Sequence, residues 1–261
     1  MIPLKDNIPT RSFPYVTLAL IVANVLVFIL FQQALSGPNG GFNSAGDESK
    51  VVHYSFIPYE LSHPNRACDA VFGESGGTGV ICGAKREAED QPAVWLTILT
   101  SMFMHGGVLH IAGNLLFLWI FGNNIEDAMG RVRFILFYLA GGVVAALAQF
   151  VVNTDSHVPT LGASGAIAAV LGGYALLYPR ARVVTLIFIV FFATVITLPA
   201  LLVLGLWFAL QVLDASSHTL GDGGVAFFAH IGGFLFGLAT IKLLASRHDP
   251  YYDRRQRLPV Y

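Results

Sequence analysis

Long apolar stretches without charged residues dominate the pattern of hydrophobic and polar positions along the chain. The hydrocarbon core of a bilayer is about 30 Å thick, and an α-helix needs about 20 mostly apolar residues to cross it. Six stretches fit this requirement, the second being the densest part of a charge-free run at 91–125, and we expect one membrane helix from each. They lie at residues 13–31, 108–121, 134–152, 158–179, 183–213 and 223–241.

The fifth stretch has 31 residues and is too long for one span. Pro199 lies inside it, and proline interrupts a helix because it has no N–H to donate. We therefore expect residues 183–195 to form an interfacial or re-entrant segment and residues 196–213 to form the helix. The pattern predicts an all-α polytopic membrane protein with six helices. Its parts are a short N-terminus at 1–12, a membrane domain at 13–245 that includes a loop at 36–92, and a basic tail at 246–261.

Composition agrees with this fold class. Hydrophobic residues make up 55% of the 261 residues and charged residues only 12%, with a mean hydropathy of +0.65. A soluble domain has about 25% charged residues, so this chain has too little polar surface for a water-soluble protein. A net charge of −1 argues against nucleic acid as a partner, because nucleic-acid-binding domains are usually strongly basic.

The distribution of Lys and Arg predicts the orientation in the membrane. If both termini are cytoplasmic, the inner segments hold 11 of the 15 basic residues, whereas 11 of the 16 acidic residues lie outside. Basic residues concentrate on the cytoplasmic side of membrane proteins, so we expect both termini there. Residues 13–31 are longer than the apolar part of a usual signal peptide and lack a strongly basic flank, which favours a retained helix.

The loop at 36–92 is the largest polar part of the chain and is expected outside. It contains Cys68 and Cys82, the only two cysteines of the sequence. An oxidising external compartment would allow them to form a disulfide. Two unpaired thiols in an irregular loop fit the sequence equally well, so the pairing stays open at this point.

No Asp, Glu, Lys or Arg falls within the apolar core of a predicted span, which counts against ion-coupled transport. Uncharged polar groups in lipid still need hydrogen-bond partners, and Ser164 and His230 are two of them. Each alone has an ordinary interpretation, as a packing serine or a histidine that bonds a neighbouring helix. Small residues near both, however, would let the two helices pack closely. The side chains of Ser164 and His230 could then come within hydrogen-bond distance of each other. The uncharged polar groups in the spans are Asn24, His105, His110, Asn114, Gln149, Ser164, Gln211 and His230.

His110 and Asn114 are four residues apart, so a helix places both on one face. Both side chains donate hydrogen bonds without a permanent charge. Such donors suit an oxyanion hole, where negative charge appears only in the transition state. A polar contact between helices is the alternative. His105 and His110 lie five apart and on different faces, and the chain has no HExxH motif, so we do not expect a metal site.

Together these residues resemble the rhomboid family of intramembrane serine proteases. The resemblance covers about residues 95–240, on predicted helices two, four and six. It implies that Ser164 is the nucleophile and His230 its general base, with no orienting carboxylate, no cofactor and no metal. It also implies that His110, Asn114 and the backbone N–H of Ser164 hold the oxyanion. The motifs are His110 and Asn114 followed by Leu115-Leu116-Phe117, then Gly162-Ala163-Ser164-Gly165 (GxSG) and Ala229-His230-Ile231-Gly232-Gly233 (AHxxG).

The resemblance further implies that the substrates are single-span membrane proteins cleaved in or near their helices within the lipid bilayer. It assigns gating of substrate access to about residues 196–224. It also suggests the bacterial cytoplasmic membrane, with the active site opening to the outer side. Two features depart from many members: Trp95 is followed by Leu96 rather than Arg, and Ala168 stands where some carry a tyrosine that stacks on the histidine.

Two alternatives belong to other functional classes. A catalytically inactive relative would bind membrane helices as a scaffold or quality-control protein, but such proteins usually lack the serine or the histidine, and this chain has both. A small channel or transporter is disfavoured by the uncharged spans. Aspartyl intramembrane proteolysis is excluded because it needs two aspartates within the membrane.

Overall fold

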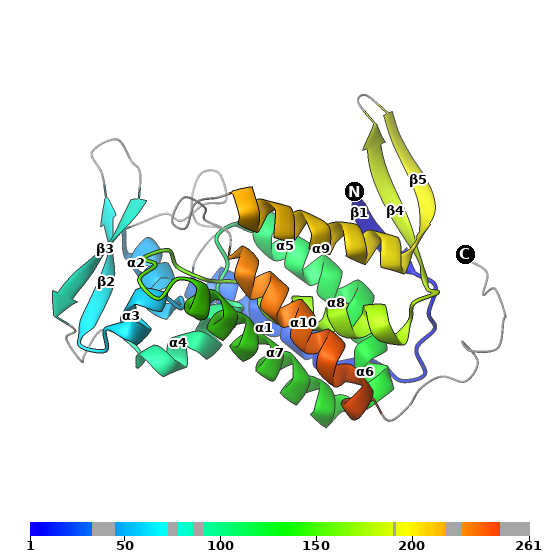
Figure 1. Cartoon of the computed structure of the whole chain (residues 1–261), viewed down its shortest axis with the longest axis horizontal. Helices are drawn as coiled ribbons and strands as arrows, with labels where there is room; N and C mark the ends of the chain where they lie inside the picture. Colours follow the sequence, from blue (N-terminus) through cyan, green and yellow to red (C-terminus); the bar gives the residue numbers. More distant parts are fainter. Residues whose placement is uncertain (33–44, 73–77, 86–90, 190–191, 218–225, 246–261) are drawn as a thin grey trace.

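The computed structural model describes residues 1–32, 45–72, 78–85, 91–189, 192–217 and 226–245. These residues form an elongated, mostly helical bundle with a small antiparallel sheet near each end (Figure 1). The helices are α1 (Tyr15–Leu26), α2 (Ala45–Tyr54), α3 (Pro58–Ser62), α4 (Val94–Thr100), α5 (Val108–Phe117), α6 (Asn123–Met129), α7 (Arg131–Val152), α8 (Ser164–Leu177), α9 (Ala200–Ser217) and α10 (Phe227–Leu244). The strands are β1 (Ile2–Asp6), β2 (Arg66–Phe72), β3 (Thr78–Lys85), β4 (Arg182–Ile189) and β5 (Phe192–Pro199).

Three described helical segments are long and apolar enough to cross a membrane, namely Val108–Met129, Arg131–Val152 and Phe227–Leu244. The first of them joins α5 to α6 through a π-helical turn at Leu118–Gly122. Shorter apolar helices lie at Tyr15–Phe31, Ser164–Leu177 and Ala200–Leu213. The six predicted helices thus correspond in position to helices of the structure, whereas six membrane crossings and the orientation of the termini stay predictions.

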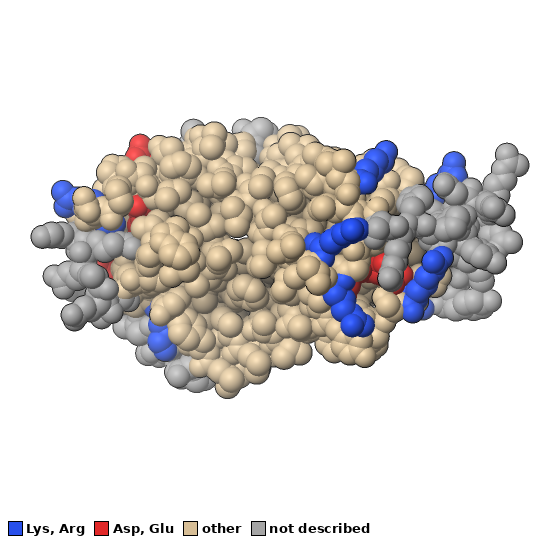
Figure 2. All heavy atoms as spheres, turned by 90° about the horizontal axis from the view of Figure 1, so that it is seen from below, with Lys and Arg blue, Asp and Glu red and all other residues tan. Residues whose placement is uncertain are grey.

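Charged residues are unevenly spread over the surface. In Figure 2, the middle of the bundle is almost free of Lys, Arg, Asp and Glu, and Lys and Arg side chains gather toward the end opposite the β2–β3 hairpin. An uncharged middle belt is the surface expected of a protein surrounded by hydrocarbon. The start of α7 and the C-terminal end of α10 lie at this basic end of the bundle (Figure 1).

The prediction of an all-α protein is wrong, because the described residues also form five strands in two sheets. Two of these strands, β4 and β5, lie in the stretch that was expected to form an interfacial or re-entrant segment followed by a helix. Residues 183–189 lie in β4 and residues 192–195 in β5, and the helix α9 begins at Ala200 instead of 196. β4 also pairs with β1 to make a three-stranded antiparallel sheet of order β1-β4-β5. The segment is rich in β-branched and aromatic residues, which favour strands, and Pro199 ends β5 because it cannot donate to a ladder.

The predicted loop at 36–92 contains the second sheet, the hairpin β2–β3. Cys68 and Cys82 are opposite each other in this hairpin and form a disulfide. This settles the pairing that the sequence left open. The loop is fastened to the bundle by paired hydrogen bonds between the backbones of Phe56 and Thr160, of 3.1 and 2.7 Å, and by a bond from Thr100 Oγ1 to the Tyr54 carbonyl.

Two acidic residues of α6 hold the start of α1. The Glu126 carboxylate accepts hydrogen bonds from the backbone N–H groups of Val16 and Thr17 and from the Thr17 hydroxyl, at 2.7–3.0 Å. Asp127 accepts from the backbone and hydroxyl of Ser12 in the same way. The first N–H groups of a helix have no partner within the helix. A negative charge at this end is also attracted by the positive end of the helix dipole. These carboxylates therefore fix α1 against the rest of the bundle.

Close contact between α8 and α10 determines where the candidate catalytic residues lie. A Cβ added to Gly233 would overlap the Gly165 carbonyl, and one added to Gly237 would overlap the Ala169 carbonyl. From the other side, a Cβ on Gly172 would overlap the backbone of Phe234. The prediction that small residues bring these two helices together is confirmed. Backbones this close leave no room for side chains between them.

Candidate active site

Ser164 is the first residue of α8 and follows a tight turn. Gly162 has φ +113°, a conformation that residues with a Cβ rarely adopt, and its N–H donates to the Ser101 carbonyl at 2.8 Å. This turn points the chain into the helix directly before the serine. The backbone N–H of Ser164 lies in the first turn of α8, where no intrahelical acceptor is available, and is therefore suited to bind an anion.

His230 lies in the first turn of α10, opposite the start of α8. Its Nε2 is 2.7 Å from the Ser164 hydroxyl oxygen, and its Nδ1 is 2.6 Å from Oε1 of Gln211 on α9. A serine hydroxyl that donates to a neutral imidazole is the arrangement needed to activate the serine as a nucleophile. The helix contact described above brings these two residues, 66 positions apart in the sequence, within that distance.

His110 and Asn114 of α5 approach the turn that precedes Ser164. A Cβ on Gly162 would lie 2.8 Å from His110 Nε2 and 3.4 Å from Asn114 Nδ2, so glycine is required there for space as well as for conformation. Asn114 Nδ2 is buried and has no hydrogen-bond partner among the described residues. His110 Nδ1 accepts a long bond from the Gly106 N–H, at 3.4 Å. With Nδ1 as an acceptor, a neutral imidazole carries its hydrogen on Nε2, which faces the turn and is then a donor.

One cavity of about 400 Å³ is lined by all four predicted site residues, His110, Asn114, Ser164 and His230. The walls come from α5, α7, α8, α9 and α10, and Trp207 of α9 contributes an aromatic side. The arrangement therefore combines a serine hydroxyl, a base that accepts its proton, and unpaired donors beside the serine. This combination is suited to acyl transfer, in which an alkoxide attacks a carbonyl and negative charge develops on the carbonyl oxygen.

His105 lies outside the cavity lining. Its backbone N–H and carbonyl bond the side chain of Gln32, and its ring packs edge to face on His110 with the centroids 5.2 Å apart. His105 thus supports the position of His110. Among the described residues, no three His, Cys, Asp or Glu side chains lie close enough together to hold a metal ion.

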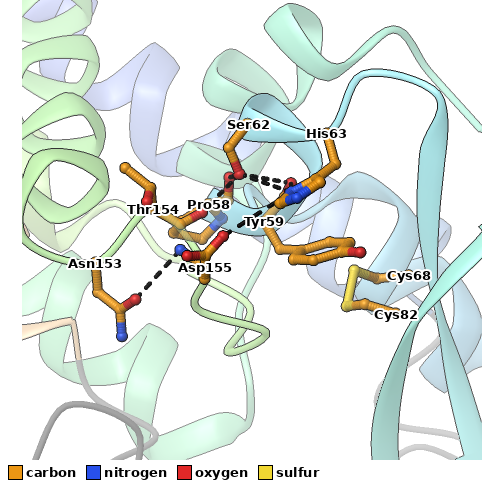
Figure 3. Close-up of polar contacts among 9 residues, drawn as sticks. All are labelled: Pro58, Tyr59, Ser62, His63, Cys68, Cys82, Asn153, Thr154 and Asp155. Carbon is orange, nitrogen blue, oxygen red and sulfur yellow. Dashed lines mark hydrogen bonds and ion pairs between the residues drawn. A yellow bond between two sulfur atoms is a disulfide. The ribbon is translucent and has the colours of Figure 1, made fainter.

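A second serine–histidine pair, Ser62 and His63, lies at the end of α3, as Figure 3 shows, and it differs in geometry. Ser62 Oγ is 3.0 Å from Nδ1 of the adjacent His63, but the hydroxyl also lies 2.8 Å from the Thr154 carbonyl, to which it donates. Asp155 approaches the same Nδ1 at 4.0 Å. Serine and carboxylate thus compete for one ring nitrogen, so the imidazole cannot relay a proton between them. These contacts connect the end of α3 with the segment between α7 and α8.

The two departures noted in the sequence have structural counterparts. Trp95 is largely exposed on α4, and the loop that contains β2 and β3 is held by the Phe56–Thr160 bridge instead. Ala168 is fully buried, and a Cβ on Gly233 would lie 3.2 Å from its methyl group. A tyrosine side chain has no space at that position. The groups found beside the imidazole are Gln211 and Trp207, which sequence analysis did not assign to the site; a glutamine within a charge-free span was the available signal.

These features define an integral membrane protein with multiple apolar helices and a serine–histidine pair that faces a cavity between them. Residues 92–247 match the family model described as Rhomboid domain, and the chain belongs to the rhomboid family. It is 38% identical over 166 residues to the rhomboid protease GluP of Bacillus subtilis, an alignment that covers 64% of this chain. It is 33% identical over 166 residues to the mitochondrial presenilin-associated rhomboid-like protein A of Danio rerio, with 62% of this chain covered.

The relatives are longer than the region of similarity. The alignment covers 30% of the Bacillus protein and 40% of the Danio protein. Rhomboid protein 1 of Saccharomyces cerevisiae mitochondria is 28% identical over 150 residues, which are 55% of this chain and 40% of that protein. The family is thus shown for residues 92–247 of this chain.

Proposed function

We propose that this protein is an intramembrane serine endopeptidase that cleaves peptide bonds in or near the transmembrane helices of single-span membrane proteins. One observation carries the proposal: the Ser164 hydroxyl lies 2.7 Å from His230 Nε2, in the same cavity as the buried and unpartnered Asn114 Nδ2. An unpaired buried donor lowers the stability of the folded state. It is useful if a negative charge forms beside it during a reaction.

The proposed reaction has two steps. Ser164 Oγ attacks the scissile carbonyl carbon while His230 Nε2 takes the hydroxyl proton, and His110, Asn114 and the Ser164 N–H stabilise the resulting oxyanion. The C–N bond then breaks, the imidazolium gives its proton to the leaving nitrogen, and an acyl ester remains on Ser164. Water adds to this ester with His230 again as the base, which releases the new carboxyl end and restores the serine.

The proposed setting is the lipid bilayer, with the β2–β3 loop and the cavity on the side opposite the basic end of the bundle. Both termini would then be on the basic, cytoplasm-like side. The named relatives include a bacterial protein and mitochondrial ones, and the mitochondrial names count against assigning a bacterial membrane from similarity. The compartment is therefore proposed only by topology: the active site opens to the outer, oxidising side, consistent with the Cys68–Cys82 disulfide.

The test is proteolysis of a tagged single-span substrate by purified protein in liposomes. Ser164→Ala and His230→Ala should both abolish cleavage, and the double variant should lose no more than either single one, because nucleophile and base act as a unit. Melting temperatures should stay close to wild type, since the serine hydroxyl faces a cavity. If the losses of activity in the two single variants added up in the double variant, Ser164 and His230 would not act as a catalytic pair. Binding of the substrate helix without cleavage by the wild type would favour the inactive helix-binding scaffold.

A further inference from the structure

The imidazole of His230 is held from the side that faces away from the serine. Gln211 Oε1 lies 2.6 Å from His230 Nδ1, and both side chains are partly buried. Gln211 belongs to α9, the helix next to α10, in a stretch whose described residues from 183 to 213 include no charged side chain. A polar side chain at such a position needs a partner, and here the partner is the candidate base.

The orientation of the amide follows from proton positions. His230 Nε2 accepts the Ser164 proton only when the neutral ring carries its hydrogen on Nδ1. Nδ1–H is then a donor and requires an acceptor, which the amide oxygen of Gln211 provides. With the amide reversed, its N–H₂ group would bond an unprotonated Nδ1 and leave the hydrogen on Nε2. The serine would then have no base.

The flat face of the ring is also bordered by α9. The Trp207 ring lies 5.7 Å from the His230 ring, centroid to centroid, and Trp207 in turn contacts Phe234 of α10. Phe208 stacks on the same Phe234 at 4.5 Å. On the α8 side, Ala168 is fully buried and offers only a methyl group. Both groups beside the imidazole therefore belong to α9, and this helix is held to α10 by aromatic contacts.

We propose that Gln211 is a positioning residue for His230, which fixes the ring in the form with hydrogen on Nδ1, and that α9 supplies a competent base only while packed on α10. The inference rests on the proposed function. It has a consequence for substrate access: any outward movement of α9 that breaks the Gln211 bond also disables the base. Substrate binding and chemistry would thus be coupled through a single hydrogen bond.

The first experiment needs no substitution at Gln211. Protein labelled with ¹⁵N-histidine is studied by NMR at neutral pH, and the His230 signals are assigned by their loss in His230→Ala. The inference predicts hydrogen on Nδ1 as the dominant neutral form. Dominant protonation of Nε2 in folded wild-type protein would overturn it.

The second experiment compares kinetics. Gln211→Met removes the acceptor at similar size, Gln211→Glu retains an acceptor oxygen, and Gln149→Met is the matched control on α7, where Gln149 Oε1 has no partner among the described residues. Gln211→Met should lower kcat about 10- to 100-fold with KM within about twofold, because general-base catalysis contributes on the order of 10²–10⁴. Gln211→Glu should recover most of this loss, and Gln149→Met should match wild type.

The outcomes separate the two proposals. If wild type cleaves and Gln211→Met has an unchanged kcat, the positioning role is wrong while the protease assignment stands. A Gln211→Glu variant as impaired as Gln211→Met, when both melt like wild type, would also overturn the role. If wild type neither cleaves nor reacts with a fluorophosphonate, the proposed function itself fails. Should Gln211→Met not fold, the histidine NMR result decides.

Discussion

Replacement of Asn114 by alanine separates a catalytic donor from a structural one. In the resting protein Asn114 is 8% exposed, and its Nδ2 has no hydrogen-bond partner among the described residues. Asn114→Ala therefore breaks no hydrogen bond made by that nitrogen in the ground state. Loss of the Asn114 amide should instead destabilise the transition state, where the amide first has a hydrogen-bond partner, the oxyanion.

The magnitude follows from these contacts. Removal of one oxyanion donor costs about 2.7–4 kcal/mol in the transition state, which is a fall of about 10²–10³ in kcat. KM should stay within about twofold because the substrate ground state does not use the donor. The free energy of unfolding should change by less than about 1 kcal/mol, and Tm by less than about 4 °C. Steady-state cleavage of a fluorogenic single-span substrate measures kcat and KM, and melting in detergent measures Tm.

Asn24→Ala is the matched control, since Asn24 is a fully buried asparagine of α1 whose Nδ2 donates to the Leu20 carbonyl at 2.7 Å. It should lower Tm and leave kcat per folded molecule unchanged. The reasoning would be refuted if Asn114→Ala behaved like this control, with lower Tm and little change in kcat. Asn114 would then be a polar contact between helices, the alternative that the sequence left open.

Three further predictions concern the rest of the structure. Burial raises the pKa of Asp6 to about 6 from 3.8; its contribution to stability should be fully present below pH 4 and fall by about 3 kcal/mol as pH rises through 6. Asp6→Asn should remove that part of the pH dependence in melting curves, and an unchanged curve would contradict it. Cys68→Ser opens a disulfide that spans 14 positions and should destabilise the β2–β3 hairpin by up to about 3 kcal/mol. Limited proteolysis should then cut this hairpin faster while the helical bundle stays intact. Glu126→Ala should lower Tm clearly, because three donors at the start of α1 lose a buried acceptor. A Tm equal to wild type would show that these three hydrogen bonds do not fix α1 to the bundle.

The candidate site was predictable because its residues follow local rules. Spacing of four puts His110 and Asn114 on one helical face, and glycines near Ser164 and His230 predicted the close contact of α8 and α10 that the structure contains. The sequence also suggested which polar side chains needed partners. It did not show that Gln211 meets His230, because that contact depends on how α9 packs on α10 and not on spacing within either helix.

The hairpin β4–β5 was missed for a different reason. Hydropathy measures only whether residues avoid water, and an apolar strand and an apolar helix have the same value. The segment's β-branched residues were the available local signal, and pairing of β1 with β4, far apart in the sequence, stabilises the strands. Hydropathy also does not give the length of a helix. The position of α8 was predicted correctly, but the helix has 14 residues, fewer than a full span requires.

The most direct test of the proposed function identifies the serine that reacts. Purified wild-type protein is treated with a fluorophosphonate, digested, and the modified residue is found by tandem mass spectrometry, beside His230→Ala. We expect one adduct, on Ser164, in wild type and its loss in His230→Ala. Absence of an adduct on folded wild-type protein, or an adduct on Ser62 instead, would contradict it.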